Sequence, residues 1–256
     1  VAGQRARAAG PFRVLMNSAC DRNCAFCPSA CSVDGPRAAL KPDELAATVS
    51  AVNATGDAPS LLLSSGVCGS PDAAMEPMLT AVRLLRERHA YDGYIHLKVM
   101  PGASDAAIRA AVTAADRVSV NLDVPNAARL ARIEPGRNWE TEVAGTLWRA
   151  RSIAEAIRAQ TGVAADVATA LVVGAAGEKD TEILETMGRC YGPWGVRRVH
   201  FGRLEPVPGT PLEAAPETLP IRVRRLTETD WLLRRFGFGI TEFLTRDDGN
   251  LDPFTD

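Results

Sequence analysis

The stretch CDRNCAFC, residues 20–27, is the most informative part of this sequence. Its cysteines, Cys20, Cys24 and Cys27, have the spacing C-x3-C-x2-C and follow a predicted strand at 12–17. A loop in that place can wrap around a small inorganic cluster. Structural zinc sites and structural [4Fe–4S] sites usually have four protein ligands, whereas three thiolates leave one iron of a cluster open. The alternative is a set of unrelated buried or zinc-binding cysteines.

Short apolar segments alternate with helical segments along the whole chain. Strands are expected at 12–17, 61–65, 94–100, 117–123, 169–174 and 197–204, and helices at 42–52, 72–88, 105–115, 138–160, 178–190 and 221–236. Parallel strands joined by helical crossovers form an open doubly wound sheet or a barrel, whole or partial. Both bind ligands at the C-terminal ends of their strands. We expect one α/β domain over 1–256, with a barrel core at about 12–205 and an extension at 206–256.

Composition narrows the classes of function. The chain has 256 residues with 29 Lys and Arg against 31 Asp and Glu, so it lacks the positive surplus of a dedicated nucleic-acid binder. No apolar run approaches the roughly 20 residues of a membrane span, and no signal-peptide pattern opens the sequence. We therefore expect a cytoplasmic protein without a membrane partner. In a reducing cytosol, four cysteines within residues 20–31 favour metal or redox chemistry over disulfides.

The cysteine motif, with the aromatic Phe26 directly before its last cysteine, resembles that of the radical S-adenosylmethionine (SAM) enzymes, which have a partial (β/α)6 barrel. The resemblance implies that Cys20, Cys24 and Cys27 hold a [4Fe–4S] cluster whose fourth iron binds the amino and carboxylate groups of SAM. One-electron reduction, from a donor such as flavodoxin or ferredoxin, then cleaves SAM to methionine and a 5′-deoxyadenosyl radical. That radical abstracts a hydrogen atom from the substrate.

Longer stretches resemble one family of radical SAM proteins, which is assigned to DNA modification or repair. They are LLLSSGVCGSPD (61–72), GYIHLKVMPGAS (93–104), ADRVSVNLDVP (115–125), ALVVGAAGEKDTEIL (170–184), TDWLLRRFGF (229–238) and NLDPFTD (250–256). In that family a helix-hairpin-helix-like tail usually follows the last stretch, and this sequence ends there. The family also does not usually carry the cysteines found here at positions 31, 68 and 190. We expect this protein to share the radical chemistry of that family, but we do not expect DNA to be its substrate.

The resemblance also implies which residues contact SAM. Ser64, Ser65 and Gly66 occupy the place of a glycine-rich segment that meets the SAM amino group. Lys98 is expected either to contact the SAM carboxylate or to form a structural salt bridge. Gly174, at the end of the fifth strand, resembles the segment that cradles the adenine.

The fourth predicted strand alternates between polar and apolar residues. Ser119, Asn121 and Asp123 are expected on one face, which points into the barrel. A strand buried on both faces should be almost continuously apolar, so this polar face indicates a site. Ser119 and Asn121 are expected to bond the SAM ribose or carboxylate. On or just after the sixth strand, His200 and Arg203, with Glu205, are candidate substrate contacts at the barrel edge.

Two further cysteines, Cys31 and Cys68, are expected at the C-terminal mouth of the barrel. They suggest ligands of a second iron–sulfur cluster, although they could also be small hydrophobic residues without a role. Cys190 is expected in helix packing. By family resemblance a second cluster serves in electron transfer or as a sulfur donor. This favours sulfur insertion into a nucleoside- or sugar-like small molecule in the biosynthesis of an antibiotic or other natural product. The alternatives are a DNA-modifying enzyme and a non-enzymatic iron–sulfur or zinc protein.

Overall fold

The computed structural model describes residues 10–56 and 60–254. Its strands are β1 (Phe12–Leu15), β2 (Ser60–Ser64), β3 (Tyr94–Lys98), β4 (Arg117–Ser119), β5 (Asp166–Val173) and β6 (Arg198–Arg203). Its helices are α1 (Pro42–Ala54), α2 (Pro71–Arg88), α3 (Asp105–Ala114), α4 (Ala127–Ile133), α5 (Ala144–Thr161), α6 (Asp180–Tyr191) and α7 (Pro220–Phe236). A π-helical turn, η1 (Trp139–Val143), precedes α5, and a short 3-10 turn, η2 (Ile240–Glu242), follows α7.

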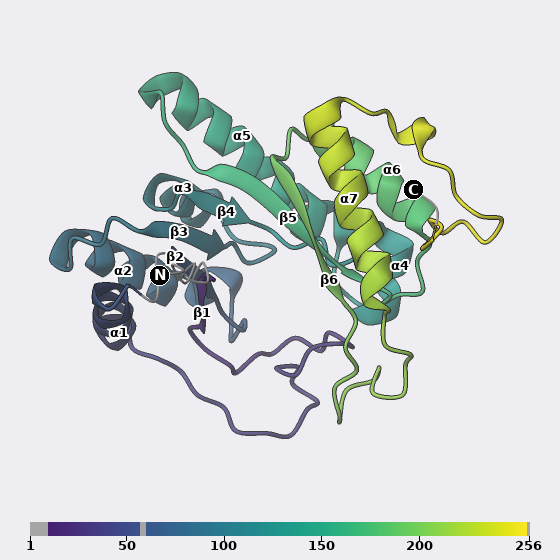
Figure 1. The fold of residues 1–256 in the computed structure, drawn as a ribbon. Coiled ribbons are helices and arrows are strands. Elements are labelled where there is room, and N and C mark those ends of the chain that lie inside the picture. The colour runs from purple at the N-terminus through teal and green to yellow at the C-terminus, as the bar shows by residue number, and fades with distance from the viewer. Residues whose placement is uncertain (1–9, 57–59, 255–256) are drawn as a thin grey trace, which may run out of the picture.

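The strands form one sheet in the order β1-β2-β3-β4-β5-β6, and every neighbouring pair is parallel. The sheet curls into a half-barrel with helices on its outer side (Figure 1). In the described part of the chain, no ladder joins β1 to β6, so the barrel is open. The predicted partial (β/α)6 barrel is thereby confirmed.

The outer face of the sheet is apolar and holds the core. Leu61, Leu63, Ile95 and Leu97 are fully buried there, against helix residues such as Met78. Burying each such side chain stabilises the fold by about 1.5–3 kcal/mol. This energy determines which side of each strand packs against the helices. No helix in the described ranges is long and apolar enough to cross a membrane.

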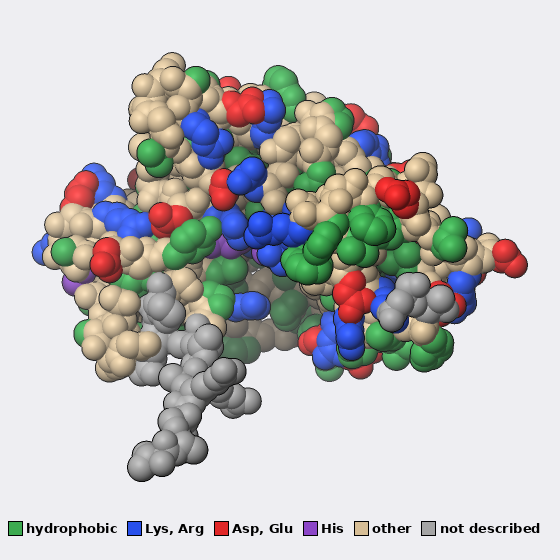
Figure 2. All heavy atoms as spheres, turned by 45° about the horizontal axis from the view of Figure 1, so that its top comes forward, with side chains coloured by type: hydrophobic (Ala, Val, Ile, Leu, Met, Phe, Trp, Pro, Cys, Tyr) green, Lys and Arg blue, Asp and Glu red, His purple; other side chains and the backbone are tan. Residues whose placement is uncertain are grey.

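The inner face of the sheet carries polar side chains around a hollow. Lys98 on β3 and Ser64 on β2 point into this hollow and are only half-buried. Basic side chains and a histidine gather around the hollow near the centre of Figure 2. The strand alternation therefore separates an apolar outer face from a polar inner face, as the sequence predicts.

The predicted strand at 117–123 is too long, because β4 ends at Ser119 and a bulge follows. The amide of Val120 donates to the Ala168 carbonyl (3.2 Å), whereas the next ladder bond on β5 comes from the amide of Asp123 to Ala170 (3.0 Å). The chain advances three residues after β4, from Val120 to Asp123, where β5 advances two, from Ala168 to Ala170. The segment after β4 therefore contains one extra residue. Asp123 has a positive φ of 61°, a conformation that Asp tolerates better than most residues.

The side chain of Thr169 completes the bulge. Its hydroxyl donates to the Val120 carbonyl (2.7 Å) and accepts from the Leu122 amide (3.2 Å). Two buried backbone groups that the ladder leaves unpaired are satisfied in this way. Bulges beside active sites change where a side chain points, and this one directs Asn121 and Asp123 into the hollow.

Two helical predictions need correction. The expected helix at 138–160 is two elements, because η1 winds more widely before α5 begins at Ala144. Helix α4 was not predicted, because it has only seven residues. Its start carries a clear signal that was overlooked, since the Asn126 side chain caps it by accepting from the Arg129 amide (3.0 Å).

The C-terminal extension packs against the last strand and helix of the half-barrel (Figure 1). Helix α7 lies along β6, and the Tyr191 hydroxyl joins the two by donating to Asp230 and accepting from the Val199 amide. The chain then returns to α6, where the Leu251 amide donates to Asp180 (3.0 Å). Helix α7 thus covers the edge of β6, while the start of the extension reaches the cysteine loop, where the Leu212 amide donates to the Ala25 carbonyl (3.2 Å).

Candidate functional site

A cavity of about 220 Å³ lies at the C-terminal ends of β1 to β4. Most of the predicted site residues line it: Cys20, Cys24, Phe26, Cys27, Ser64, Ser65, Gly66, Lys98, Asn121 and Asp123. These residues come from four separate segments of the chain. The fold therefore brings the cysteine motif and the predicted SAM contacts of three strands to one place.

The three cysteines are half-buried free thiols. The Cys20 sulfur accepts two backbone N–H bonds, from Arg22 (3.4 Å) and Val67 (3.3 Å). Burial raises the pKa of the Cys27 thiol and, together with the nearby Glu134 carboxylate, that of Cys24. Without a bound metal these two side chains are neutral, so metal binding must displace their protons.

The three thiols supply a donor set for an iron–sulfur cluster. They line one cavity at the strand ends. Three thiolates can each bind a different iron atom of a cubane and leave the fourth iron open. Backbone N–H bonds to sulfur, as at Cys20, are also a feature of iron–sulfur sites. The donor chemistry of Cys20, Cys24 and Cys27 therefore fits a [4Fe–4S] cluster with three protein ligands.

The cysteine loop rests directly on the turn after β2. The amide of Gly66 donates to the Asn17 carbonyl (2.6 Å), and a Cβ atom at Gly66 would lie 2.3 Å from the carbonyl oxygen of Ala19. Asp21 ties the two segments further, because its amide donates to Val67 and its carboxylate accepts from Gly69 (2.6 Å). Close backbone contact thus gives a structural reason for the glycine, separate from the predicted SAM contact.

Lys98 stands at the base of this cavity without an acidic partner. Its ammonium donates to the Asn121 side chain, and no carboxylate of the described residues lies within 4.0 Å of it. Burial lowers the pKa of Lys98 to about 8, partly offset by Asp123. The expected structural salt bridge is therefore not formed among these residues. The ammonium retains N–H donors for an anionic ligand.

Glu134 and Arg137, which the sequence did not indicate, complete the wall. They form an ion pair (2.8 Å) whose side chains are 7% and 6% exposed. The Glu134 carboxylate also accepts from the Cys24 thiol (3.2 Å), and Arg137 lines the cavity with a buried Nε that has no partner among the described residues. Burial raises the pKa of Glu134, and the Arg137 charge opposes this shift.

Helix α4 places this ion pair beside the cysteines. Glu134 follows its last residue, Ile133, whose carbonyl accepts from the Ala25 amide in the cysteine loop (2.8 Å). The end of α4 therefore packs on the loop between two of the cysteines. The overlooked Asn126 cap is the sequence signal that could have located this segment.

Two predicted SAM contacts do not line the cavity. Ser119 is fully buried, and its hydroxyl is paired with Nε2 of His96 (2.8 Å). Gly174 faces the extension, where a Cβ atom would lie 2.0 Å from the Thr218 hydroxyl. The amide of Gly174 donates to Glu178, whose carboxylate also accepts from Ala176 (3.1 Å). In this conformation Ser119 is part of the buried interior, and Gly174 is part of the turn after β5.

The other cysteines occupy different surroundings. Cys31 and Cys68 are exposed and lie outside the cavity lining, although both flank the cysteine loop. The Cys31 amide donates to the Arg22 carbonyl (2.9 Å). Cys190 is fully buried in α6, which confirms its predicted packing role, and burial raises its pKa to about 12.

The two candidate substrate contacts on β6 are placed differently. His200 lies in the hollow, with its ring 6.1 Å from that of His96. Arg203 lies at the exposed end of the strand and is paired with Glu205 (2.6 Å) and Glu217. His200 therefore remains a candidate contact, while the charge of Arg203 is already balanced.

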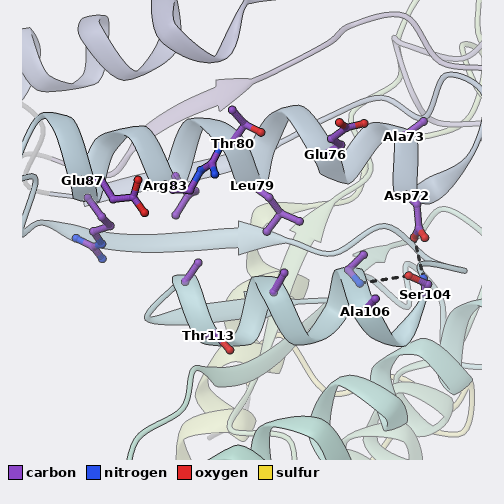
Figure 3. A pocket seen from close by; sticks show the side chains of 15 residues that line it. Asp72, Ala73, Glu76, Leu79, Thr80, Arg83, Glu87, Ser104, Ala106 and Thr113 are labelled. Carbon is purple, nitrogen blue, oxygen red and sulfur yellow. Dashed lines mark hydrogen bonds between the residues drawn. The ribbon is translucent and has the colours of Figure 1, made fainter.

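A larger cavity, of about 970 Å³, lies on the outer side of the molecule between α2 and α3. Figure 3 shows its walls, which include Asp72, Leu79, Ala106 and Thr113. Asp72 accepts from the Ser104 amide (2.8 Å), so this carboxylate already has a partner. The groove contains no cysteine or histidine and is separate from the cysteine cavity. Its size alone does not make it the reactive site.

The fold is shared with several solved structures. Methylornithine synthase, PylB, matches with a TM-score of 0.65 and 17% identity, over 88% of this chain and 61% of that protein. The [FeFe]-hydrogenase maturase HydG from Carboxydothermus hydrogenoformans matches with a TM-score of 0.65 and 14% identity, over 88% and 51%. TsrM from Kitasatospora setae, a radical SAM methyltransferase with cobalamin and a [4Fe–4S] cluster bound, matches with a TM-score of 0.53 and 15% identity, over 80% and 39%.

At these identities the similarity establishes the fold. The chain spans 61% or less of the length of each of these proteins. No protein-family model matches the sequence, and no curated protein does.

Replacing Gly66 tests the contact between the cysteine loop and the turn after β2. In Gly66→Ala the new methyl group would overlap the Ala19 carbonyl, so the loop must move and the cysteines with it. We expect the anaerobically reconstituted variant to hold less than half the iron of the wild type, as measured by iron analysis and visible absorbance. Gly35→Ala is the matched control, because a Cβ atom there meets nothing within 4 Å. Full iron loading of Gly66→Ala would contradict this role.

Proposed function

We propose that this protein is a radical SAM enzyme. Cys20, Cys24 and Cys27 would hold a [4Fe–4S] cluster, which would supply one electron for the cleavage of SAM to methionine and a 5′-deoxyadenosyl radical, the species that takes hydrogen from a substrate. The observation that carries this proposal is the convergence of three thiols with Lys98 and Asn121 on one cavity at the C-terminal strand ends. The partial barrel, shared with a radical SAM methyltransferase that binds such a cluster, supports it.

The chain's own residues would bind and orient SAM. The Lys98 ammonium and the Arg137 guanidinium, both in the cavity wall, provide positive charge for the SAM carboxylate. The Ser65 backbone carbonyl would accept from the amino group, whereas the Ser64 carbonyl already accepts from the Met16 amide (2.7 Å). Asn121 and Asp123, which the bulge directs into the cavity, provide polar atoms for the ribose.

The electrostatics of the wall would keep these groups in place. Arg137 is paired with Glu134 and also lies near Asp123, so its positive charge opposes the cost of burying both carboxylates. The buried Glu134–Arg137 pair fixes both side chains more firmly than a surface ion pair would. The bond from the Cys24 thiol to Glu134 belongs to the metal-free protein, because the thiol would lose its proton on binding iron.

For the substrate we propose a nucleoside- or sugar-like small molecule, with a reductant such as flavodoxin or ferredoxin as external partner. We also propose a second iron–sulfur cluster with Cys31 and Cys68 among its ligands, which would supply sulfur to a substrate carbon radical in natural-product biosynthesis. The position of both exposed thiols beside the cysteine loop supports this. Cys68 lies between Val67 and Gly69, the two residues that bond to Asp21 of that loop.

The formation of 5′-deoxyadenosine tests the proposed chemistry. Protein reconstituted anaerobically with iron and sulfide should convert SAM to 5′-deoxyadenosine and methionine when dithionite is added, as measured by chromatography. Cys24→Ala should abolish the product, because one of three cluster ligands is lost. Cys190→Ala, which removes a thiol buried in α6, should retain it. A reduced, iron-loaded wild type that leaves SAM intact would instead indicate a non-enzymatic iron–sulfur protein.

Lys98 is expected to contribute to SAM affinity. In Lys98→Met the side chain keeps its length but loses its charge, so the dissociation constant for SAM should rise about tenfold, the effect of one lost hydrogen bond to a charged group. Equilibrium dialysis on the reconstituted protein without reductant measures this. Lys41→Met, at the exposed start of α1, is the control and should bind SAM normally. Unchanged affinity in Lys98→Met would remove Lys98 from the SAM site.

Iron analysis tests the second cluster. If the protein holds two cubane clusters, it should contain about eight iron atoms per chain. Cys68→Ala should lower this number to about four, because the second cluster loses one of its ligands. The Cys68→Ala variant should still form 5′-deoxyadenosine, because its other cluster is intact, but it should make no sulfur-containing product. If its iron content equals that of the wild type, Cys68 is not a cluster ligand.

A further inference from the structure

The floor of the hollow, below the cysteine cavity, carries a group of basic and imidazole side chains from three strands. His96 on β3 is in register with Arg117 on β4, and Arg198 and His200 lie on β6. The rings of His96 and His200 are 6.1 Å apart although two strands separate β3 from β6 in the sheet. The curl of the sheet therefore brings these strands to face each other.

Small residues on β5 leave the space in which these side chains meet. Ala168 is the ladder partner of Arg198, and Ala170 is the partner of His200. Ala168 is also in register with Ser119 on β4. At these two positions the intervening strand carries only methyl groups, so no long side chain of β5 stands between those of β4 and β6.

Several polar atoms on this floor have no partner. Nε of Arg117, Nε of Arg198 and Nε2 of His200 are buried without a hydrogen bond to any described residue. The Arg117 guanidinium lies over the Tyr94 ring, 5.8 Å from its centre. Buried polar atoms in folded proteins are nearly always bonded, so these three atoms can take a partner from outside the chain, either water or a ligand.

The charge of the floor is positive. Asp166 is the ladder partner of Arg117, and its carboxylate pairs with Arg158 (3.7 Å) and Arg197 (3.6 Å). Asp230 binds Arg234. No carboxylate of the described residues lies within 4.0 Å of Arg117 or Arg198.

The histidine pKa values are consistent with this excess of positive charge. Burial, together with nearby positive groups, lowers the pKa of His96 to about 3 and that of His200 to about 4. Both imidazoles are neutral at pH 7, so each can donate one N–H bond while the arginines carry the charge.

We propose that this floor binds an oxyanion of the substrate, a phosphate monoester or a carboxylate, through Arg117 and Arg198 with His200 as an additional hydrogen-bond donor. Guanidinium groups bind both oxyanions through paired N–H bonds. The inference rests on the proposed function, because it assigns the hollow to the substrate.

The geometry connects this floor to the reactive cavity. Lys98, which lines the cysteine cavity, is two residues after His96 on β3, about 7 Å along the strand. Through Ser119 and Ala168, Lys98 lies in the same row of the sheet as Arg198. A substrate with its anionic group on the floor would present an atom roughly one sugar ring away to the SAM side. The floor therefore selects a nucleotide-, sugar-phosphate- or sugar-acid-like molecule over its neutral counterpart.

Binding of simple anions tests the proposal without a turnover assay. Reconstituted protein is saturated with SAM, without reductant, and titrated calorimetrically with inorganic phosphate or with acetate at low ionic strength. Arg117→Gln and Arg198→Gln should each weaken anion binding about tenfold, the effect of losing one charge-assisted bond, and Arg117→Lys should restore part of it. Arg109→Gln, on the outer helix α3, makes the same change in charge and should bind as the wild type does.

The outcomes separate the two anion sources and the two proposals. Phosphate binding tighter than acetate indicates a phosphorylated substrate, and the reverse indicates a carboxylate. If neither anion binds, or if both glutamine variants bind with wild-type affinity while retaining full iron and SAM, the floor is not an anion site. If the protein binds no anion but forms 5′-deoxyadenosine, the anion site is wrong and the radical SAM proposal is kept. If it binds anions but does not cleave SAM, the radical SAM proposal is wrong and the anion site is kept.

Discussion

The site depends on the contact between the backbone of the cysteine loop and the turn after β2. Gly66 has no side chain where the backbone at Ala19 passes, and the two segments exchange hydrogen bonds around that point. The loop contains no helix or strand of its own, so its shape comes from what it touches. On its other side, α4 and the Glu134–Arg137 ion pair hold the segment around Cys24. The thiols are therefore positioned by two neighbours that are far from them in sequence.

Much of this arrangement could be predicted from the sequence, because it depends on local patterns. Apolar strands that alternate with helices predict a parallel sheet, open or closed into a barrel, and the resemblance carried by the cysteine motif selects the partial barrel that is observed. The polar alternation at Asn121 and Asp123 is likewise visible in the sequence alone, and both residues line the cavity. Each of these signals needs only a few neighbouring residues.

What could not be predicted depends on contacts between distant segments. The bulge after β4 exists because the Thr169 hydroxyl, on another strand, satisfies backbone groups of Val120 and Leu122. Glu134 follows a helix too short to show a clear apolar period, and its role arises only when the fold brings it to Cys24. Ser119 was assigned to the cofactor because its strand position is right, but its hydroxyl is used by His96.

The open edge of the sheet affects how the hollow can respond to what it binds. In a closed barrel the strand number and the stagger fix the diameter. Here no ladder joins β1 to β6 in the described residues, so the radius of the hollow is not set by closure. Instead, the segment after β6 reaches the loop after β1, where the Leu212 amide donates to the Ala25 carbonyl (3.2 Å). The width of the hollow is thus linked to the position of the cysteine loop and not to a closed ladder of strands.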